Sequence, residues 1–245
     1  MLRESDTLRR MTIQATDGEM GRVTEFYFDD ESWAIRYFVV RTGSWLSGRD
    51  VLLKPAVVTS CDWDRHVLCV SLTTDEIASS PDASDDRPVS RQQEIEYLRY
   101  FDQPPYYMLG AEVGGAAVAL DAAMRAAAAE AEAAGVPPPT HLRSSHEVGS
   151  YRLEAADGPI GHVRGFLLDD ATWQVRYLVV DTGSWWSGRQ VVFAPGWVSR
   201  VSWGERCLHV RLTRDVIRTG PPYPGADGVT PEYEAALERH YGHGD

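Results

Sequence analysis

Two pairs of adjacent acidic residues are the first candidates for chemistry in this sequence. The pairs are Asp29-Asp30 and Asp169-Asp170. Paired carboxylates can bind a metal ion or act as a general acid and base. Adjacent residues at a strand end point in opposite directions, however, so neither pair naturally forms a catalytic dyad. If a tight turn follows each pair, Arg36 and Arg176 lie beside the acids on the next strand. We therefore predict structural Arg–Asp ion pairs with turn capping, in preference to a metal site or catalysis.

A loop that occurs twice, at residues 42–49 and 182–189, is the second candidate. Each loop contains glycines, hydroxyl groups and a final arginine, which could cradle an anion. The spacing differs from that of a P-loop and no long helix follows, so a hairpin is the better interpretation. Large apolar side chains at the tips are candidate contacts for a protein partner, because tryptophan is enriched at binding hot spots. These candidate contact residues are Trp45, Leu46, Trp185 and Trp186.

Histidine and cysteine show no spacing typical of a metal or redox site. The close pairs His141 with His146 and His240 with His243 lack a third ligand at a suitable spacing. The three cysteines contain no CxxC pair, and an odd number cannot form a closed disulfide framework. They are Cys61, Cys69 and Cys207. The sequence therefore predicts no metal site, no cofactor and no catalytic residue, and it favours a reducing, cytoplasmic location.

Composition and charge exclude several classes of protein. With 24 Lys+Arg against 36 Asp+Glu the formal net charge is -12, and Lys54 is the single lysine, which argues against nucleic-acid binding. The charged start has no apolar segment typical of a secretory signal. Residues 114–134 are rich in alanine but interrupted by charges, so no membrane insertion is predicted. The 43% hydrophobic content is enough for a folded core.

The chain repeats itself at a constant offset of 140 positions. Residues 17–21 match 157–161, 28–33 match 168–173, 36–40 match 176–180, and 42–49 match 182–189. A period this long is too large for a solenoid repeat, so it indicates a duplicated domain. The expected organisation is a first domain at 1–103, a linker at 104–139 rich in Pro, Gly and Ala, and a second domain at 140–245. Each domain is expected to fold by itself.

Within each copy the pattern predicts short strands separated by turns. The runs at 35–40 and 175–180 are almost continuously apolar, as expected for a strand covered on both sides. A proline stops the following strand in each copy. Five or six short strands without crossover helices describe a small antiparallel barrel. The prediction is a mainly β protein of two tandem barrels, each with a short carboxyl-terminal helix, joined by an Ala-rich linker helix at 120–134.

These repeated motifs resemble the PRC-barrel family. The string Asp-Gly-x-x-Gly, then Asp-Asp-x-x-Trp-x-x-Arg-Tyr-x-Val-Val-x-Thr-Gly, then Trp-x-x-Gly-Arg-x-Val occurs in both copies. The resemblance implies a six-stranded barrel-like domain, found in the cytoplasmic part of the photosynthetic reaction-centre H subunit and in a ribosome-maturation factor. It implies an adaptor module without a shared active site. The H subunit has an amino-terminal membrane helix that this sequence lacks.

Three functions remain open from the sequence. The leading expectation is a non-enzymatic scaffold that binds a protein partner or itself through its duplicated domains. The alternative is an accessory factor similar to the H subunit, in peripheral contact with a membrane electron-transfer or light-harvesting complex. The least favoured is a metal-dependent enzyme at the two acid pairs. Fold resemblance cannot choose among them, because function resides in sites and not in folds.

Overall fold

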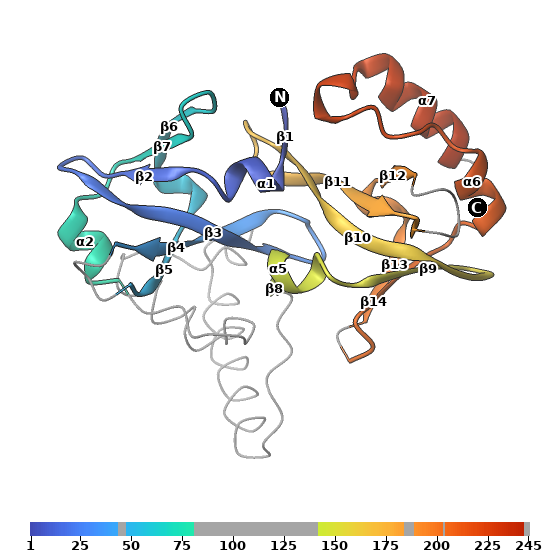
Figure 1. The fold of residues 1–245 in the computed structure, drawn as a ribbon, viewed down its shortest axis with the longest axis horizontal. Coiled ribbons are helices and arrows are strands. Elements are labelled where there is room, and N and C mark those ends of the chain that lie inside the picture. The colour runs from blue at the N-terminus through green and yellow to red at the C-terminus, as the bar shows by residue number, and fades with distance from the viewer. Residues whose placement is uncertain (44–47, 81–141, 184–188, 203, 243–245) are drawn as a thin grey trace, which may run out of the picture.

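Two mixed β-sheets, one from each copy, form the body of the molecule (Figure 1). The structure is a computed structural model that describes residues 1–43, 48–80, 142–183, 189–202 and 204–242. The first copy comprises β1 (Leu2–Glu4), α1 (Ser5–Leu8), β2 (Thr12–Gln14), β3 (Glu19–Asp29), β4 (Ile35–Thr42), β5 (Asp50–Leu53), the 3-10 turn η2 (Pro55–Val57), β6 (Val58–Asp62), β7 (Val67–Val70) and α2 (Thr74–Ala78).

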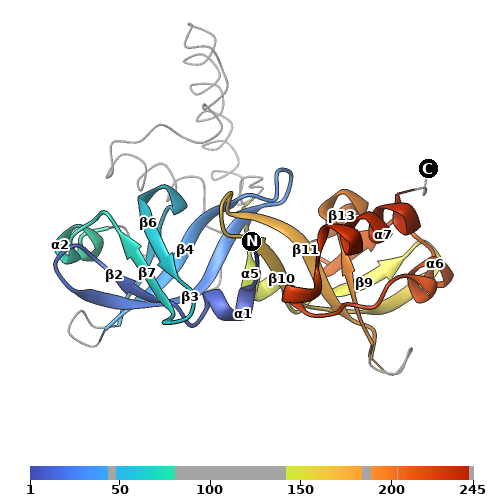
Figure 2. The same ribbon diagram turned by 90° about the horizontal axis from the view of Figure 1, so that it is seen from above.

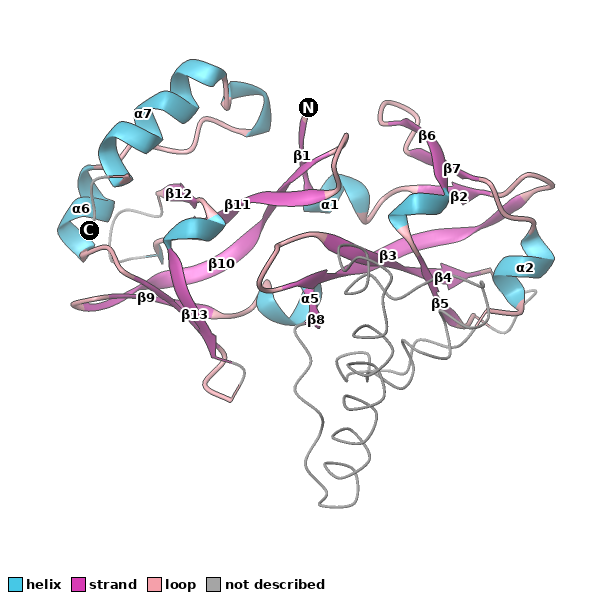
Figure 3. Cartoon of the chain, turned by 180° about the vertical axis from the view of Figure 1, so that it is seen from behind, coloured by secondary structure: helices cyan, strands magenta, loops and turns pink. Residues whose placement is uncertain are grey.

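The second copy repeats this order, and its described part continues further, to the helix α7. It comprises β8 (Leu142–Ser144), α5 (Ser145–Val148), β9 (Arg152–Ala155), β10 (Gly158–Asp169), β11 (Gln174–Asp181), β12 (Gln190–Phe193), η5 (Pro195–Trp197), β13 (Val198–Ser202), β14 (Cys207–Val210), α6 (Arg214–Thr219), η6 (Ala226–Gly228) and α7 (Pro231–Tyr241). Figure 3 shows that strands dominate the described chain and that α7 is its longest helix. The prediction of a mainly β protein is therefore confirmed, and the repeated order of the elements is consistent with two tandem copies.

The sheets are mixed, which corrects the prediction of purely antiparallel barrels. Their strand orders are β5-β4-β3-β2-β7-β6 and β12-β11-β10-β9-β14-β13. In each sheet one central pair is parallel, β2 with β7 and β9 with β14. Within the described ranges the end strands β5 and β6 share no ladder. Pro55, which has no N–H to donate, begins a 3-10 turn between them, and Pro195 does the same in the second copy. Closed barrels are therefore not seen.

Local predictions from the apolar pattern are confirmed where the structure describes them. In β4, Phe38 and Val40 face the main core while Tyr37 and Val39 face a second cluster, so the strand is covered on both sides. The single helical turns after the last strands are capped by Thr73 and Thr213. The terminal helix of the second copy is α7, capped by Thr230. The linker, its predicted helix at 120–134, and the first copy's terminal helix lie outside the described residues.

The first strand of each copy pairs with the sheet of the other copy. Strand β1 runs antiparallel to β10, with Leu2 opposite Asp169, and β8 runs antiparallel to β3, with Leu142 opposite Asp29. The helical turns α1 and α5 that follow these strands lie at the junction of the two lobes (Figures 1 and 2). The exchange is reciprocal, so the duplicated chain has the arrangement of a dimer with an approximate two-fold axis.

Backbone hydrogen bonds between the hairpin turns follow the same symmetry. The Ile35 amide donates to the Trp173 carbonyl at 2.8 Å, and the Val175 amide donates to the Trp33 carbonyl at 2.8 Å. Between them Ala34 and Gln174, which are counterparts at the offset of 140, form an isolated antiparallel bridge. Trp33 and Trp173 both have positive φ, 57° and 54°, a region that non-glycine residues seldom adopt. The tight turn after each acid pair therefore contacts the equivalent turn of the other copy.

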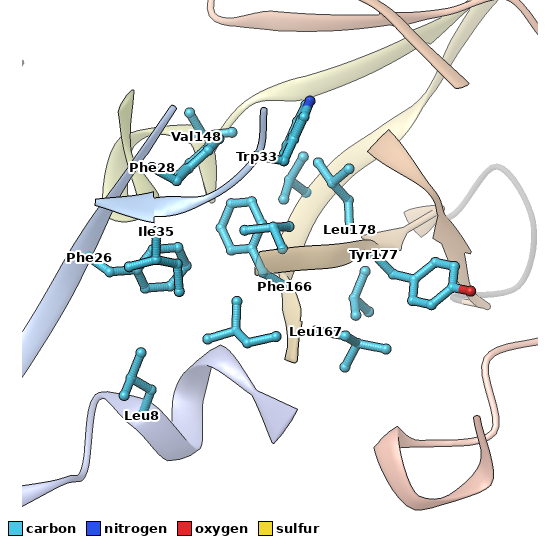
Figure 4. Packing of buried hydrophobic residues seen from close by; sticks show 14 of the residues in the cluster. Leu8, Phe26, Phe28, Trp33, Ile35, Val148, Phe166, Leu167, Tyr177 and Leu178 are labelled. Atoms are coloured by element: carbon cyan, nitrogen blue, oxygen red, sulfur yellow. The ribbon is translucent and has the colours of Figure 1, made fainter. Parts of the chain in front are cut away.

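Buried side chains of both copies form one continuous hydrophobic cluster. The ring centre of Phe166 lies 5.6 Å from those of both Phe26 and Phe28 (Figure 4). The ring centre of Trp173 lies 4.9 Å from that of Phe38. Phe26 and Phe166 are counterparts, so the approximate axis passes between them. The interior is therefore shared by the two copies, whereas the sequence predicts that each domain folds by itself. We call all contacts between residues 1–80 and 142–242 the copy interface.

Glycine is required where β3 and β10 cross close to the next strand. A Cβ atom at Gly21 would lie 2.2 Å from the Arg41 carbonyl oxygen. We expect Gly21→Ala to lower the free energy of unfolding by about 1–3 kcal/mol, because the neighbouring backbone must move. Chemical denaturation measures this. Gly196→Ala is the matched control, with nothing within 4 Å of its Cβ. Equal effects of the two substitutions would contradict the steric explanation.

Candidate functional site

Asp29 is a turn-capping residue. Its Oδ1 accepts hydrogen bonds from the Glu31 amide at 3.2 Å, the Ser32 amide at 2.7 Å and the Ser32 hydroxyl at 2.7 Å. Arg36 Nη2 lies 3.9 Å from Asp29 Oδ2 and also donates to the Ser32 hydroxyl. The carboxylate is buried, and these donors satisfy it. The arrangement fixes the turn that carries Trp33 into the copy interface.

Asp169 has the same role in the second copy, but its arginine differs. Its Oδ1 accepts from the Ala171 and Thr172 amides at 2.9 and 3.1 Å. Burial alone would raise the pKa of Asp169, but these amides hold it below its ordinary value. Arg176, expected beside the acid pair, has Nη2 3.6 Å from Glu234 Oε1. Helix α7 supplies this competing carboxylate, which sequence spacing alone did not place there.

The second acid of each pair binds the exchanged strand of the other copy. Arg143 Nε on β8 lies 2.6 Å from Asp30 Oδ2, with side chains only 16% and 10% exposed. Arg3 Nε on β1 lies 3.2 Å from Asp170 Oδ2, whose Oδ1 also lies 2.6 Å from the amino terminus. From the sequence, Arg36 and Arg176 were expected beside the acid pairs, whereas Arg3 and Arg143 were not. The signal was present, because Arg3 and Arg143 are themselves separated by 140 positions.

Two serines complete the reciprocal contacts. The Ser145 hydroxyl accepts from the Phe26 amide at 3.0 Å, and the Ser5 hydroxyl accepts from the Phe166 amide at 3.1 Å. Both serines are buried. Each serine hydroxyl therefore binds a backbone amide of the opposite copy's long strand, β3 or β10. The acid pairs and these serines therefore hold the two copies together.

Breaking one interface ion pair is expected to destabilise the whole chain. Asp30→Asn leaves Arg143 facing a neutral amide in a largely buried position, so we expect the free energy of unfolding to fall by about 1–3 kcal/mol. Asp62→Asn is the control, because its pair with Arg65 is exposed and spans 3.8 Å. Denaturant unfolding of both variants gives the comparison. An effect of Asp30→Asn no larger than that of the control would contradict a structural role for the pair.

The candidate partner-contact residues lie outside the described residues. They are Trp45, Leu46, Trp185 and Trp186. The stems of their loops are described and are held alike. The Thr42 amide and hydroxyl both donate to the Arg49 carbonyl, at 2.9 and 3.0 Å, and the Thr182 amide and hydroxyl donate to the Arg189 carbonyl at 3.1 and 2.7 Å. In each copy, these hydrogen bonds connect the two ends of the loop at the edge of the sheet.

A shallow hollow in the second copy lies between α6 and α7 and is lined by basic side chains. They are Arg189, Arg218, Arg239 and His240. Arg189 also donates to the Gly220 carbonyl at 3.2 Å, and Arg218 pairs with Asp215. In the first copy Arg189 and Arg239 have basic counterparts, Arg49 and Arg99, whereas Arg218 and His240 have none. The hollow adjoins the stem of the 184–188 loop and gives this end of an acidic protein a local positive charge.

One group of side chains in the described ranges has the composition of a metal site. Glu154, Cys207 and His209 bring a carboxylate oxygen, a thiol and a ring nitrogen within 4.8 Å of one another. They lie on β9 and β14, apart from both acid pairs in the sequence and in the sheet order. The histidine spacing in the sequence predicts no metal site, because this group contains a single histidine. The available signal was Cys-x-His in a strand, which places both side chains on one face.

No family model matches the chain, and no curated protein matches it. Of the helices in the described ranges, none is long and apolar enough to cross a membrane.

Proposed function

We propose that this chain is a tandem PRC-barrel-like protein that acts as a non-enzymatic scaffold. In this proposal it binds a protein partner, or a second copy of itself, through the two tryptophan loops. The reciprocal strand exchange is the observation that best supports the proposal. It joins two equivalent lobes through one core, so the strands that flank the two loops, β4 with β5 and β11 with β12, are held in a fixed arrangement (Figure 1). A scaffold with two equivalent sites gains affinity for a repeated or dimeric partner through effective concentration.

The acid pairs favour this function over metal-dependent catalysis. A catalytic carboxylate must be able to reach a substrate or a metal ion. Asp29 and Asp169 are occupied by turn amides, and Asp30 and Asp170 are occupied by arginines of the opposite copy. Recruiting any of these groups for chemistry would break a contact that holds the fold together. Their duplication is therefore explained by structure.

Partner capture with crosslinking mass spectrometry from the native cell tests the proposal. The expected result is one stoichiometric protein, or a second copy of the chain, crosslinked next to the two loops. The loop variant combines Trp45→Ala, Trp185→Ala and Trp186→Ala and should lose capture while keeping its circular dichroism spectrum. Arg65→Ala, which removes a side chain 84% exposed at a hairpin tip, is the control and should retain capture. Full capture by the folded loop variant would refute the loops as the contact.

The same experiment addresses the alternative function. Recovery of a membrane electron-transfer or light-harvesting complex would support an accessory factor similar to the reaction-centre H subunit. Recovery of a soluble partner or a homo-oligomer would support the scaffold. Crosslinks confined to the basic hollow beside Arg189 would place the contact on the second copy alone, and would refute two equivalent sites.

A further inference from the structure

The second sheet carries a group of potential metal ligands on the face of β14 opposite its core residues, with Cys207 buried at 1% exposure between two partly exposed side chains. Cys207 and His209 are two positions apart on β14, while Leu208 and Val210 between and after them are buried in the main core. Strand β9 runs parallel to β14 and places Glu154 opposite His209 in the register. The topology thus brings three side chains from two adjacent strands to one spot, and the parallel pairing missed by the sequence analysis is what creates it.

The spacing of the three groups matches the size of a zinc coordination sphere. His209 Nδ1 lies 3.8 Å from Glu154 Oε2, and the three ligand atoms lie within 4.8 Å of one another. With Zn²⁺ bonds of about 2.0–2.3 Å, neighbouring ligands in a tetrahedron stand about 3.3–3.7 Å apart. Small rotations of the side chains therefore suffice. Glu154 and His209 are 39% and 26% exposed at their side chains, which leaves a path for the ion from solvent.

A second carboxylate, that of Glu205, lies beside the other ring nitrogen of His209, where a metal-binding histidine commonly has a hydrogen-bond acceptor. Glu205 Oε2 lies 3.5 Å from His209 Nε2 and 3.0 Å from Arg200 Nη2. When Nδ1 binds a metal ion, Nε2 carries the proton and donates it to a hydrogen-bond acceptor, commonly a carboxylate. In the metal-free structure Arg200 Nη2 lies 3.0 Å from Nε2 and can only donate to it, so the neutral ring carries its proton on Nδ1. Metal binding at Nδ1 moves the proton to Nε2 and leaves Arg200 paired with Glu205 alone. Glu205 is thus a positioning residue that fixes the ring and its tautomer.

The first copy supplies an internal comparison. The positions equivalent to Glu154, Glu205, Cys207 and His209 are occupied by Gln14, Arg65, Val67 and Cys69. The same pair of parallel strands is present there, with Gln14 opposite Cys69. An ancestral structural requirement of the fold would be expected in both copies. The set of ligands occurs in one copy only, as expected for a site added after the duplication.

We propose that Glu154, Cys207 and His209 bind one Zn²⁺ ion. Glu154 contributes Oε2, Cys207 contributes Sγ, His209 contributes Nδ1, and a water molecule takes the fourth, solvent-facing position. The thiol proton passes to solvent as the Zn–S bond forms, and the thiolate and carboxylate together balance the two positive charges. In the metal-free protein, burial raises the pKa of the Cys207 thiol, so binding releases close to one proton.

Calorimetric titration of the full chain with Zn²⁺, in a phosphine reductant, tests the site. One ion per chain is expected. The Cys207→Ser, His209→Gln and Glu154→Gln variants should each lower the affinity at least about 10-fold, and Glu205→Gln about 10–100-fold without changing metal-free thermal stability. The cysteine controls Cys61→Ser and Cys69→Ser should bind normally. Co²⁺ in place of Zn²⁺ should give a sulfur-to-metal charge-transfer band that only Cys207→Ser abolishes among the three cysteine variants.

Each outcome decides the question. Absence of stoichiometric binding would overturn the proposal, as would binding that Cys207→Ser leaves unchanged, which indicates adventitious binding to other histidines. If Cys207→Ser fails to fold, His209→Gln and Glu154→Gln carry the test, because both side chains are partly exposed. Wild-type affinity in both variants would equally overturn it. Loss of thermal stability in metal-free Glu205→Gln, with unchanged zinc affinity, would show that Glu205 supports only the ion-pair network with Arg200.

Discussion

Neither half of the chain, produced separately as residues 1–103 or 140–245, is expected to fold as a monomer. Each half lacks the strand that completes its sheet, because β1 pairs with β10 and β8 pairs with β3. Each half also exposes the interior it shares with the other. Mixing the halves should restore a cooperative melt and a one-to-one complex, since all contacts of the copy interface form between separate chains as well as within one. Circular dichroism and light scattering measure both effects.

A full chain cleaved at a protease site inserted in residues 104–139 is the control. It should remain associated and melt as the intact protein does, apart from the concentration dependence that cleavage introduces. Each half alone is expected to be unfolded or to form a homodimer, in which two identical copies exchange strands as the two copies do here. A folded, cooperative monomer of either half would contradict the exchange and would support independent domains.

The duplication and most of the strands could be predicted from the sequence, but the exchange could not. Periodicity shows that a strand has a buried face; it does not show which strand it pairs with. In this chain the partner of β1 is ambiguous, because β3 and β10 have nearly the same sequence pattern and either strand could pair with β1. The exchanged pairing is made by strands of only three residues, β1 and β8. It is supported by a few contacts such as that of Arg143 with Asp30, which lie 113 positions apart. The repeated motifs begin at Asp17, so they do not include these short strands or Arg143.

The two candidate sites differ in how far the sequence could define them. The acid pairs were visible as repeated motifs, and their capping role follows from local turn chemistry that involves Ser32 and Ala171. The group at Cys207 depends on Glu154, which a parallel pairing brings from 53 positions away. A parallel pair has no short connection and leaves no local signature, so only the folded chain shows it.

Phe166→Ala is expected to lower the free energy of unfolding by about 3–5 kcal/mol. The side chain is 1% exposed and contacts Phe26 and Phe28 of the first copy, each at a ring-centre distance of 5.6 Å. The truncation removes buried area and leaves a cavity at the approximate axis, where packing from both copies resists collapse. A double-mutant cycle with Phe26→Ala should give a coupling of about 0.5–1.5 kcal/mol, as expected for an edge-to-face aromatic pair.

Phe193→Ala separates the loss of a large buried ring from the loss of the shared core. Phe193 is fully buried and lies 5.9 Å from Tyr241 within the second copy. Both variants should lose stability, but only Phe166→Ala should weaken the first copy directly. Hydrogen exchange followed by mass spectrometry should then show faster opening of β3 and β4 in Phe166→Ala. If the first copy kept wild-type protection while the second copy opened, the two copies would be energetically independent and the shared core would carry no stability.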